Sequence, residues 1–375
     1  MKSRFLTTNV TRAALLVLPL AAAGCNGSQS VSGPPAADKT APPTTTVTAT
    51  ANPERLAWGK AMVKNRAPHG GCFKASHPST TWEEVPCRKP PSRPLVPGRP
   101  GAMQVGNGGS ADFASSTSGP IIEDVIGSFP TVSGLSLAGA AGGDYVTSGF
   151  TLQINTQAQA NTAICNAGPN PSGCTAWQQF VYATDESGPS LFIQYWLIGY
   201  SATASYTCPN NGNPYDNGYY VGTTVQHQYD CYWDSPYASP APAVYGGADL
   251  ADLSLGSWSF SSGDGVMLYY DGTVTTFTAD DPPVLGLWTW WTSAEFNVFG
   301  PGGGSAAVFN VGTTMAVQQE IGPTTANATC TGASYTGEIN NLNVVPGSCC
   351  VVGGTSGGIF FTQSNAPGAT AFACP

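Results

Sequence analysis

The sequence predicts an all-β fold: an antiparallel β-sandwich or lectin-like jelly roll, preceded by a short helical or irregular N-terminal segment. From about Met103 onward, short alternating stretches of apolar and polar residues are separated by Gly, Pro, Asn, Asp and Ser, as in strands joined by turns. No apolar period of 3.6 residues persists there, which argues against long helices. About 270 residues are enough for one large core between two sheets.

Several stretches have the clearest strand pattern. They are residues 150–155, 177–184, 191–200, 266–270, 272–278, 292–299, 306–311, 315–321 and 359–363. The second and third are separated by the turn-like residues 185–189 and predict a hairpin. About ten strands at this spacing indicate a sandwich of two sheets.

The first 25 residues predict a secretion signal. Basic residues precede the apolar run 13–20, and small residues follow up to Cys25. The ending 22–25 resembles a bacterial lipobox, in which the cysteine is lipidated and becomes the mature N-terminus, while cleavage near Ala23 is the alternative. We therefore expect a protein outside the cytoplasm, either secreted or held at the cell envelope by lipidation of Cys25.

The cysteine count supports this expectation. Of the eleven cysteines, ten remain after Cys25 is set aside, enough for five disulfides in an oxidising compartment. Short spacings predict Cys72–Cys87, Cys165–Cys174 and Cys208–Cys231, while Cys330, Cys349, Cys350 and Cys374 would form two more bonds with their pairing left open. No zinc-type spacing is present and the three histidines are scattered, so we expect neither a metal nor a cofactor.

Three parts follow from composition. After the signal at 1–25, residues 26–100 are a tether and a basic region that resembles a pro-segment, and residues 101–375 form the sandwich domain. Within the second part we predict a helix from Pro53 to Asn65, a disulfide-closed loop at 71–87 and an exposed, proline-rich basic linker at 88–100.

Charge is divided just as sharply. All thirteen Lys and Arg lie at or before Arg99, whereas eighteen of the 22 acids lie at or after Asp112. Below about pH 4 most of the repulsion among these carboxylates disappears, which favours an acidic exterior, with composition drift in an acidophile as the alternative. The acidic body argues against nucleic acid as a partner. A basic segment on an acidic body also suits a zymogen released by acid, or else a tether near an anionic envelope.

Glu295 is the first candidate for chemistry. Strand alternation places Trp291, Ser293, Glu295, Asn297 and Phe299 on one face. A carboxyl group on an aromatic face without a nearby cation should have a raised pKa, and it can act as a general base or acid at about pH 3–5. The alternative is a solvated carboxylate on an exposed sheet.

Amides inside the predicted hairpin are the second candidates. Gln178, Gln179 and Gln194 are flanked by Trp177 and Trp196. Their N–H groups can donate to an oxyanion or to sugar hydroxyls, although they can equally pair with one another.

Other motifs are weaker. Glu338 is a second candidate acid, although a turn position fits it equally well. Asp280 and Asp281 can ligate calcium, but a turn is favoured. Residues 354–358 match the letters GxSxG without the strand-turn-helix context of a nucleophile elbow, and His227 is the only histidine of the body, so a serine hydrolase is disfavoured.

These segments resemble the glutamic peptidases, namely the eqolisins and neprosin. Residues 293–299 are similar to the eqolisin strand that carries the catalytic Glu, and residues 191–196, with Cys208 and Cys231 downstream, are similar to a neprosin strand and its cysteine-linked loop. Residues 177–180 lie where both families keep a catalytic residue, a Gln in eqolisins. The resemblance implies a secreted, acid-active β-sandwich enzyme.

One position departs from that pattern. The eqolisin catalytic Glu falls four residues after the Glu of its Ala-Glu-aromatic run, where this chain has Phe299. The role would therefore pass to Glu295 or Glu338. The Gly-Cys-Phe and Val-Pro-Cys motifs at 71–73 and 85–87, with the Ala-Glu-Phe-Asn-Val strand at 294–298, also resemble those of bacterial secreted proteins, a likeness that implies no activity.

The sequence thus favours a secreted, acid-active glutamic endopeptidase. Glu295, or Glu338 in second place, would activate water, and Gln178 or Gln179 would stabilise the oxyanion. The expected substrate-binding residues are Gln194, Trp196, Trp177, Trp291 and Asn297.

The competing function is a non-catalytic module that binds carbohydrate or another polymer, with Trp177, Trp196, Trp290 and Trp291 stacking on sugar rings. A lipid-anchored structural module is a third possibility. In each case we expect a monomer that meets an extracellular protein or polysaccharide, and that touches a membrane only through Cys25.

Overall fold

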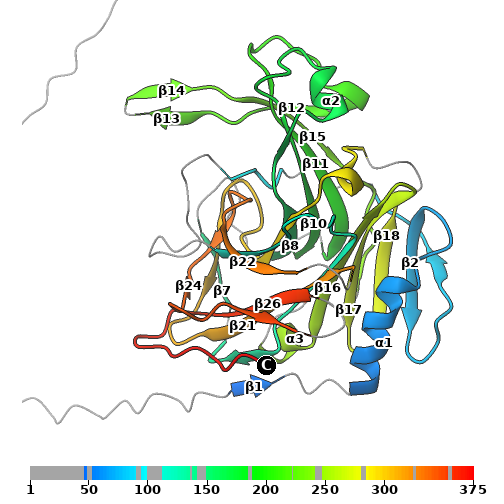
Figure 1. Cartoon of the computed structure of the whole chain (residues 1–375), viewed down its shortest axis with the longest axis vertical. Coiled ribbons are helices and arrows are strands. Elements are labelled where there is room, and N and C mark those ends of the chain that lie inside the picture. Colours follow the sequence, from blue (N-terminus) through cyan, green and yellow to red (C-terminus); the bar gives the residue numbers. More distant parts are fainter. Residues whose placement is uncertain are drawn as a thin grey trace, which may run out of the picture. The chain divides into compact units, whose positions relative to one another are not determined.

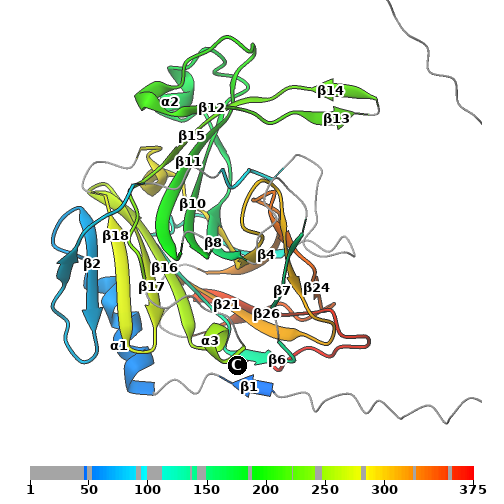
Figure 2. The same ribbon diagram turned by 180° about the vertical axis from the view of Figure 1, so that it is seen from behind.

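Two large β-sheets packed face to face form the framework of the described chain (Figures 1 and 2). The computed structural model describes residues 46–48, 53–89, 94–98, 112–135, 137–141, 149–184, 188–221, 223–240, 247–279, 284–323, 327–353 and 357–375. The large sheets are antiparallel throughout their described pairings. The prediction of an all-β sandwich is confirmed.

The larger sheet has 12 strands within the described residues. They are β1 (Thr46–Thr48), β2 (Gly71–Ser76), β3 (Glu83–Val85), β5 (Asp124–Ser128), β6 (Thr131–Ser133), β16 (Leu253–Phe260), β17 (Gly263–Tyr270), β18 (Thr273–Thr278), β21 (Thr314–Gly322), β24 (Asn343–Val344), β25 (Cys350–Val352) and β26 (Gly357–Ser364). Their order is β1-β6-β21-β5-β16-β17-β18-β2-β3, and β26 pairs with β21, β24 and β25.

The second sheet carries the candidate site and has nine strands in the part of the chain that the structure describes. They are β4 (Asp112–Ser116), β8 (Phe150–Thr156), β9 (Gln159–Ala160), β10 (Thr175–Thr184), β11 (Ser190–Ser201), β12 (Asn213–Asp216), β15 (Tyr229–Asp234), β19 (Ser293–Phe299) and β22 (Thr329–Ala333). Their order is β12-β15-β11-β10-β8-β19-β4-β22, and β9 pairs with β10.

Smaller elements surround the sheets. A three-stranded sheet contains β7 (Leu137–Ala141), β20 (Ala306–Phe309) and β23 (Ile339–Asn340), and a hairpin of β13 (Tyr219–Val221) and β14 (Thr224–Gln226) extends away from the sandwich (Figure 1). The helices are α1 (Pro53–Lys64), α2 (Ala163–Asn166) and α3 (Gly247–Ala251), with 3₁₀ turns η1 (Pro209–Asn211) and η2 (Leu287–Thr289). Among the described residues no helix is long and apolar enough to cross a membrane.

The basic N-terminal region is built into the larger sheet. Helix α1 starts at Pro53, as predicted, and its Trp58 and Met62 join an apolar cluster on β17 and β18. Strand β2 pairs with β18, so the expected loop at 71–87 is a hairpin that extends the sheet. The unit that contains these elements and the sandwich runs over residues 43–375.

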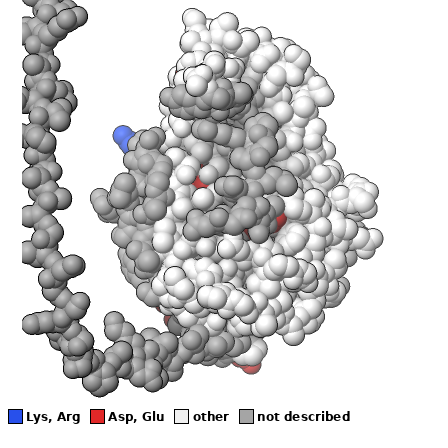
Figure 3. Space-filling model, turned by 90° about the vertical axis from the view of Figure 1, so that its left-hand side faces the viewer, with Lys and Arg blue, Asp and Glu red and all other residues white. Residues whose placement is uncertain are grey.

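Ion pairs connect this region to the acidic body. Arg55 lies 2.9 Å from Asp271, and Lys60 lies 2.5 Å from Glu320. Both cations are more than two-fifths exposed, so each pair contributes at most about 1 kcal/mol. Charged atoms are few on the face shown in Figure 3, outside the segments drawn in grey.

The core between the sheets depends on close approach at one glycine. Phe296 of β19 packs on Phe129, with ring centroids 5.0 Å apart. A Cβ atom on Gly127 of β5 would lie 2.2 Å from Phe296 Cγ, so the ring or one of the two strands would have to move to admit it. Glycine at this position therefore fixes the depth of β19, the strand that also carries Glu295.

Five disulfides close loops around the sheets. The three predicted pairs are confirmed, and the remaining four cysteines pair as Cys330–Cys349 and Cys350–Cys374. Such a set is compatible with an oxidising, extracellular compartment. Cys25 lies outside the described residues.

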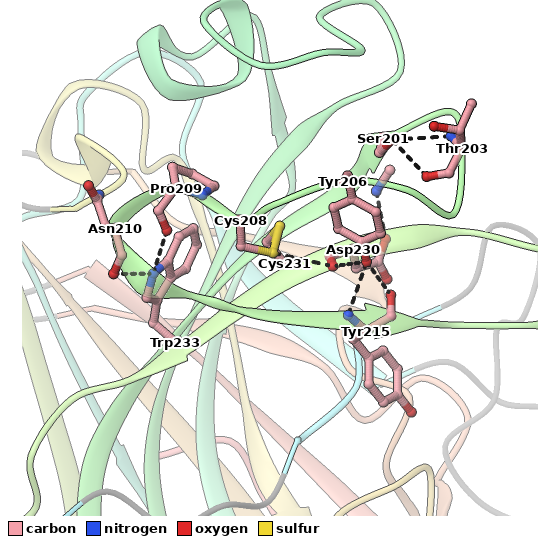
Figure 4. Close-up of a disulfide and its surroundings, with 11 residues drawn as sticks. Ser201, Thr203, Tyr206, Cys208, Pro209, Asn210, Tyr215, Asp230, Cys231 and Trp233 are labelled. Atoms are coloured by element: carbon pink, nitrogen blue, oxygen red, sulfur yellow. Dashed lines mark hydrogen bonds between the residues drawn. A yellow bond between two sulfur atoms is a disulfide. The ribbon is translucent and has the colours of Figure 1, made fainter.

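The Cys208–Cys231 bond holds a loop against the start of β15 (Figure 4). The Tyr206 hydroxyl donates to the carbonyl of Asp230 over 2.7 Å, and Trp233 Nε1 donates to the carbonyl of Pro209 over 3.1 Å. These bonds fix the strand that ends at Asp234, one edge of the candidate site.

Candidate functional site

A row of polar side chains crosses the nine-stranded sheet. Strand pairing sets Asp234 of β15 opposite Gln194 of β11, and Gln194 opposite Gln179 of β10. The row continues because Gln179 is opposite Asn155 of β8, and Asn155 is opposite Glu295 of β19. Directly opposed residues on neighbouring strands have side chains on the same face. These five residues, called the polar row below, therefore share one face.

The alternation of β19 directs Glu295 to this face. Its neighbours Ala294 and Phe296 are buried in the core between the sheets. Successive residues of a strand point to opposite faces, so Glu295 points away from that core. Its side chain is nevertheless fully buried, because other segments of the chain cover the polar row.

One of these covering segments is residues 94–98, called the strap below. Its Leu95 N–H donates to Gln194 Oε1 over 2.9 Å. Its Val96 N–H donates to Glu338 Oε1 over the same distance, 2.9 Å. The strap thus binds a member of the polar row through its backbone.

The strap also forms a short antiparallel ladder with residues 335–337. The Gly337 N–H donates to the Val96 carbonyl over 2.7 Å, and the Gly98 N–H donates to the Tyr335 carbonyl over 2.8 Å. The prediction of an exposed linker is therefore wrong for residues 94–98. Two apolar residues among the prolines are enough to bury this extended stretch.

The two apolar side chains of the strap are buried on opposite sides of the polar row. Leu95 clusters with Val181 of β10, whereas Val96 clusters with Trp177 of the same strand. Gln179 lies midway between Val181 and Trp177 on β10. The peptide group that joins Leu95 to Val96 therefore crosses above the row.

Glu338 links the strap to the polar row. Besides the Val96 N–H, its Oε1 accepts the N–H of Gly304 over 3.1 Å. Its Oε2 accepts the hydroxyl of Thr336, whose oxygen accepts from Gln179 Nε2 over 3.4 Å. Burial raises the pKa of Glu338 to about 7, although its hydrogen bonds act in the opposite direction. Glu338 is therefore uncharged in acid.

Glu295 lies beside Tyr335 at the other end of this arrangement. Asn155 Nδ2 donates to Glu295 Oε2 over 3.1 Å, and the Tyr335 N–H donates to the same atom over 3.2 Å. Burial raises the pKa of Glu295, and the charge of Asp112 raises it further. The hydrogen bonds lower it by less, so the covered site keeps this carboxyl group protonated in acid.

Asp112 and Asn297 continue the buried polar network. Asn297 Nδ2 donates to Asp112 Oδ2 over 2.7 Å and to Gln363 Oε1 over 2.9 Å. Burial also raises the pKa of Asp112. In this structure Asn297 is thus bonded to two buried neighbours and is covered from solvent.

Two buried oxygens of the polar row, Asn155 Oδ1 and Gln179 Oε1, have no hydrogen-bond partner among the residues that the structure describes. A buried acceptor left without a partner costs about 1–3 kcal/mol. The two residues are neighbours across the sheet, and Asn155 is also the neighbour of Glu295. This part of the row therefore suits a water molecule or a ligand N–H that donates hydrogen bonds.

Gln178 is not part of the row. It precedes Gln179 and so points to the opposite face, where its Nε2 donates to Asp264 Oδ2 over 2.9 Å. The Ser259 hydroxyl donates to the other oxygen of Asp264 over 2.6 Å. Gln178 therefore belongs to a buried network between the two sheets.

Trp291 is also placed elsewhere. Its ring stacks on Phe180 in the core, with centroids 5.6 Å apart. The prediction that it shares a face with Glu295 is wrong, because β19 begins at Ser293 and strand alternation does not reach back to Trp291.

Trp177 and Trp196 lie on the same side of the sheet as the strap and contact its Val96. Trp196 Nε1 donates to Gln194 Oε1 over 2.8 Å, and its ring stacks on Tyr232 at 5.1 Å between centroids. Both tryptophans are buried, so in this form neither presents a ring to solvent.

Asn155, Asp234 and Thr336 also take part in the site, and the sequence alone did not single them out. The available signal for Asn155 was the polar face that it shares with Thr151 and Gln153, opposite the apolar face of the same strand, but only strand pairing shows that it lies between Gln179 and Glu295. Of the weaker motifs, His227 is half-exposed and bonded to Asp216 over 2.8 Å. Residues 280–283 and 354–356 lie outside the described chain.

Within the described ranges, no group of three or more His, Cys, Asp or Glu is arranged to hold a metal ion. No protein-family model matches the chain, and no curated protein is significantly similar to it. The geometry of the polar row and the strap is therefore the basis for inferring a function.

Proposed function

We propose that this chain is a secreted hydrolase of the glutamic-peptidase type, in which Glu295 activates water and Gln179 stabilises the oxyanion. The observation that carries the proposal is the polar row itself. Glu295 and Gln179 share one face with only Asn155 between them, beneath an extended segment of polypeptide. Strands about 4.8 Å apart put the backbones of Glu295 and Gln179 about 10 Å apart, which suits a peptide group held between the two side chains.

Each step has a group suited to it. The Glu295 carboxylate takes one proton from a water molecule whose other hydrogen donates to Asn155 Oδ1 or Gln179 Oε1, and the water oxygen bonds to the substrate carbonyl carbon. The carbonyl electron pair moves to oxygen, which accepts a hydrogen bond from Gln179 Nε2 in place of the long bond to Thr336. Glu338 gives its proton to the departing nitrogen as the C–N bond breaks. The proton held by Glu295 then returns through solvent to Glu338.

The two carboxyl groups differ in a way that fits these roles. Glu338 contacts the strap N–H and has a pKa raised to about 7 while the strap covers it. A substrate peptide bound in place of the strap would cover Glu338 in the same way, so that it keeps its proton in acid. Once water reaches Glu295, the burial that raises its pKa is reduced, and the pKa moves back towards the ordinary value of 4.5. At a pH between these two pKa values, Glu295 is a carboxylate that can act as the base and Glu338 is a carboxylic acid that can donate a proton.

The described form is the latent one in this proposal, since the strap covers the row. Acid weakens the exposed ion pairs of α1, as the charge division suggests. The carboxyl groups beneath the strap oppose its release in acid. Glu338 and Asp234 have pKa values raised to about 7 by burial, so both are uncharged in acid while the strap covers them. Exposing them would return their pKa values towards the ordinary range, and at a pH above that range both groups would have to lose a proton, so acid favours the closed strap. We therefore propose that cutting of the chain, rather than acid alone, frees the strap.

The proposal also includes a location outside the cytoplasm. Residues 1–25 would direct secretion, and lipidation of Cys25 would hold the protein at the envelope until the segment before the body is cut. The five disulfides support an oxidising destination. A carbohydrate-binding module remains the competing function and needs exposed aromatic rings. Trp290 and Trp291 are buried in the core, and the strap covers Trp177 and Trp196 in the described form.

The test uses the chain from Asn26 onward, with a specific protease site replacing residues 103–109 so that the connection after the strap can be cut. Cut and uncut protein is incubated with an unfolded protein substrate at pH 3.5, 4.5 and 7, and products are identified by mass spectrometry. Cut protein should cleave the substrate in acid. Glu295→Gln should abolish this cleavage, whereas Glu320→Gln, a change at a partly exposed ion pair, should leave it intact. Cleavage that survives Glu295→Gln would move the base, with Glu338 next, and inert cut protein would contradict the proposal.

A further inference from the structure

The strap is bound in the manner of a peptide ligand. It lies extended, pairs edge to edge with residues 335–337 and exchanges backbone hydrogen bonds at Val96 and Gly98. A peptide that adds a strand in this way is held by its main chain, and the pockets that receive its side chains determine which sequences bind.

The first pocket receives Leu95. Its walls are Val181, Ala183 and Phe192 of β10 and β11, with Tyr237 at the margin. Leu95 is only 1 % exposed, so the pocket encloses an aliphatic side chain almost completely.

The second pocket receives Val96, which is 8 % exposed. Trp177 and Trp196 form its floor, and Tyr335 packs beside them. Apolar walls of this kind favour aliphatic side chains and disfavour charged ones, because a charge would lose its hydration without a partner.

Between the pockets, the bond from Leu95 to Val96 lies over the polar row. The N–H on one side of it is held by Gln194, and the nitrogen of the bond itself donates to Glu338. A substrate bound in the same way would place its own peptide bond at this point.

We propose that the groove under the strap selects extended polypeptide segments with two adjacent aliphatic residues, that cleavage falls between these residues, and that the strap is an internal stand-in for such a segment. This inference rests on the proposed function for the cleavage step. The binding step can be measured separately.

The test frees the groove in two ways, by Leu95→Asp together with Val96→Asp, and by the cut at residues 103–109. Val311→Asp, at a 79 % exposed position, is the matched control. Two fluorescein-labelled peptides are compared, Gly-Pro-Leu-Val-Pro-Gly and the same peptide with Ser-Ser in place of Leu-Val. Each is titrated with the proteins at pH 4.5, and binding is measured by fluorescence anisotropy. The proteins in this titration also carry Glu295→Gln, which prevents turnover. Turnover of both peptides is followed by mass spectrometry with Glu295 intact.

We expect the Leu-Val peptide to bind at least about tenfold more tightly than the Ser-Ser peptide, since two buried aliphatic side chains are lost, and to bind only when the strap is displaced. Cleavage should fall between Leu and Val. Efficient cleavage of both peptides would overturn this inference and leave the proposed function standing. Selective binding without cleavage at any pH would support the groove and contradict the peptidase. Binding of cellohexaose in place of either peptide would overturn the inference.

If the double variant does not fold, the cut protein decides the matter alone. Its strap competes with the added peptide, so it should bind the Leu-Val peptide more weakly than an open groove would, yet still more tightly than the Ser-Ser peptide. Equal affinity for the two peptides in the cut protein would overturn the inference.

Discussion

The clearest quantitative prediction concerns Asp264, the carboxyl group buried between the sheets. Burial raises its pKa from an ordinary 3.8 to about 7, while hydrogen bonds from Ser259 and Gln178 lower it by less. A raised folded-state pKa means that its contribution to stability is full below about pH 3.8 and is lost as the pH rises towards 7. Three pH units at about 1.4 kcal/mol each give a loss of about 4 kcal/mol at most.

Asp264→Asn should therefore behave differently at the two ends of this range. The amide resembles the neutral acid and can keep bonds to both neighbours, so at pH 4 its free energy of unfolding should be close to that of the wild type. At pH 8 the variant should be the more stable protein, by about 2–4 kcal/mol.

Urea unfolding between pH 4 and 8 measures this difference, with Asp271→Asn as the control. Asp271 is exposed and paired with Arg55, so its variant should differ from the wild type by less than about 1 kcal/mol at either pH. A variant of Asp264 that is equally destabilised at pH 4 and pH 8 would refute the reasoning, because it would mean that the native carboxyl group is charged in acid.

Substitutions at Gly127, Glu338 and Lys60 test the core packing, the strap and the attachment of α1. Gly127→Ala should lower the free energy of unfolding by about 1–3 kcal/mol in urea titrations, since the new methyl group meets a core phenylalanine; an unchanged value would mean that the sheets can separate freely. The Val96 N–H should be better protected from hydrogen exchange at pH 5 than at pH 8, after correction for the intrinsic exchange rate, because closing the strap takes up a proton on Glu338. Glu338→Gln should reduce this difference. Equal protection at the two pH values in the wild type would contradict the account. Lys60→Ala should change stability by less than about 1 kcal/mol, given the partial exposure of its pair with Glu320, and a larger loss would show that this ion pair holds α1 in place.

Much of the fold was accessible from sequence because alternation is a local property. The predicted strand at 177–184 is found as β10 at Thr175–Thr184, and that at 191–200 as β11 at Ser190–Ser201. The predicted helix ends one residue early, at Lys64. Short cysteine spacings also sufficed for three disulfides, whereas the other two needed the fold to distinguish adjacent Cys349 and Cys350.

The site was only partly accessible, because it depends on strand pairing between distant segments. Alternation could place Glu295 on a face, but not next to Asn155, which lies 140 residues earlier. Nor could it tell Gln178 from Gln179 as the member of that face, since the order of strands and the burial of both sides were unknown. The strap escaped notice for a related reason: its prolines and flanking charges suggest exposure, while the pockets for its two apolar residues exist only after folding.

The central claim is that the polar row is a catalytic site. Gln178 and Gln179 are adjacent in the chain but lie on opposite faces of the sheet, so comparing their variants tests this claim most directly. The measurement is the rate of peptide cleavage at pH 4.5 by strap-cut protein carrying Gln179→Met or Gln178→Met, with folding checked by circular dichroism. The account predicts that Gln179→Met loses about 10²–10³-fold in kcat, the usual cost of removing one oxyanion donor. Gln178→Met should lose stability but keep kcat within about threefold, because it contacts only the core network and not the transition state. Comparable losses in both variants, or full activity in Gln179→Met, would contradict the claim.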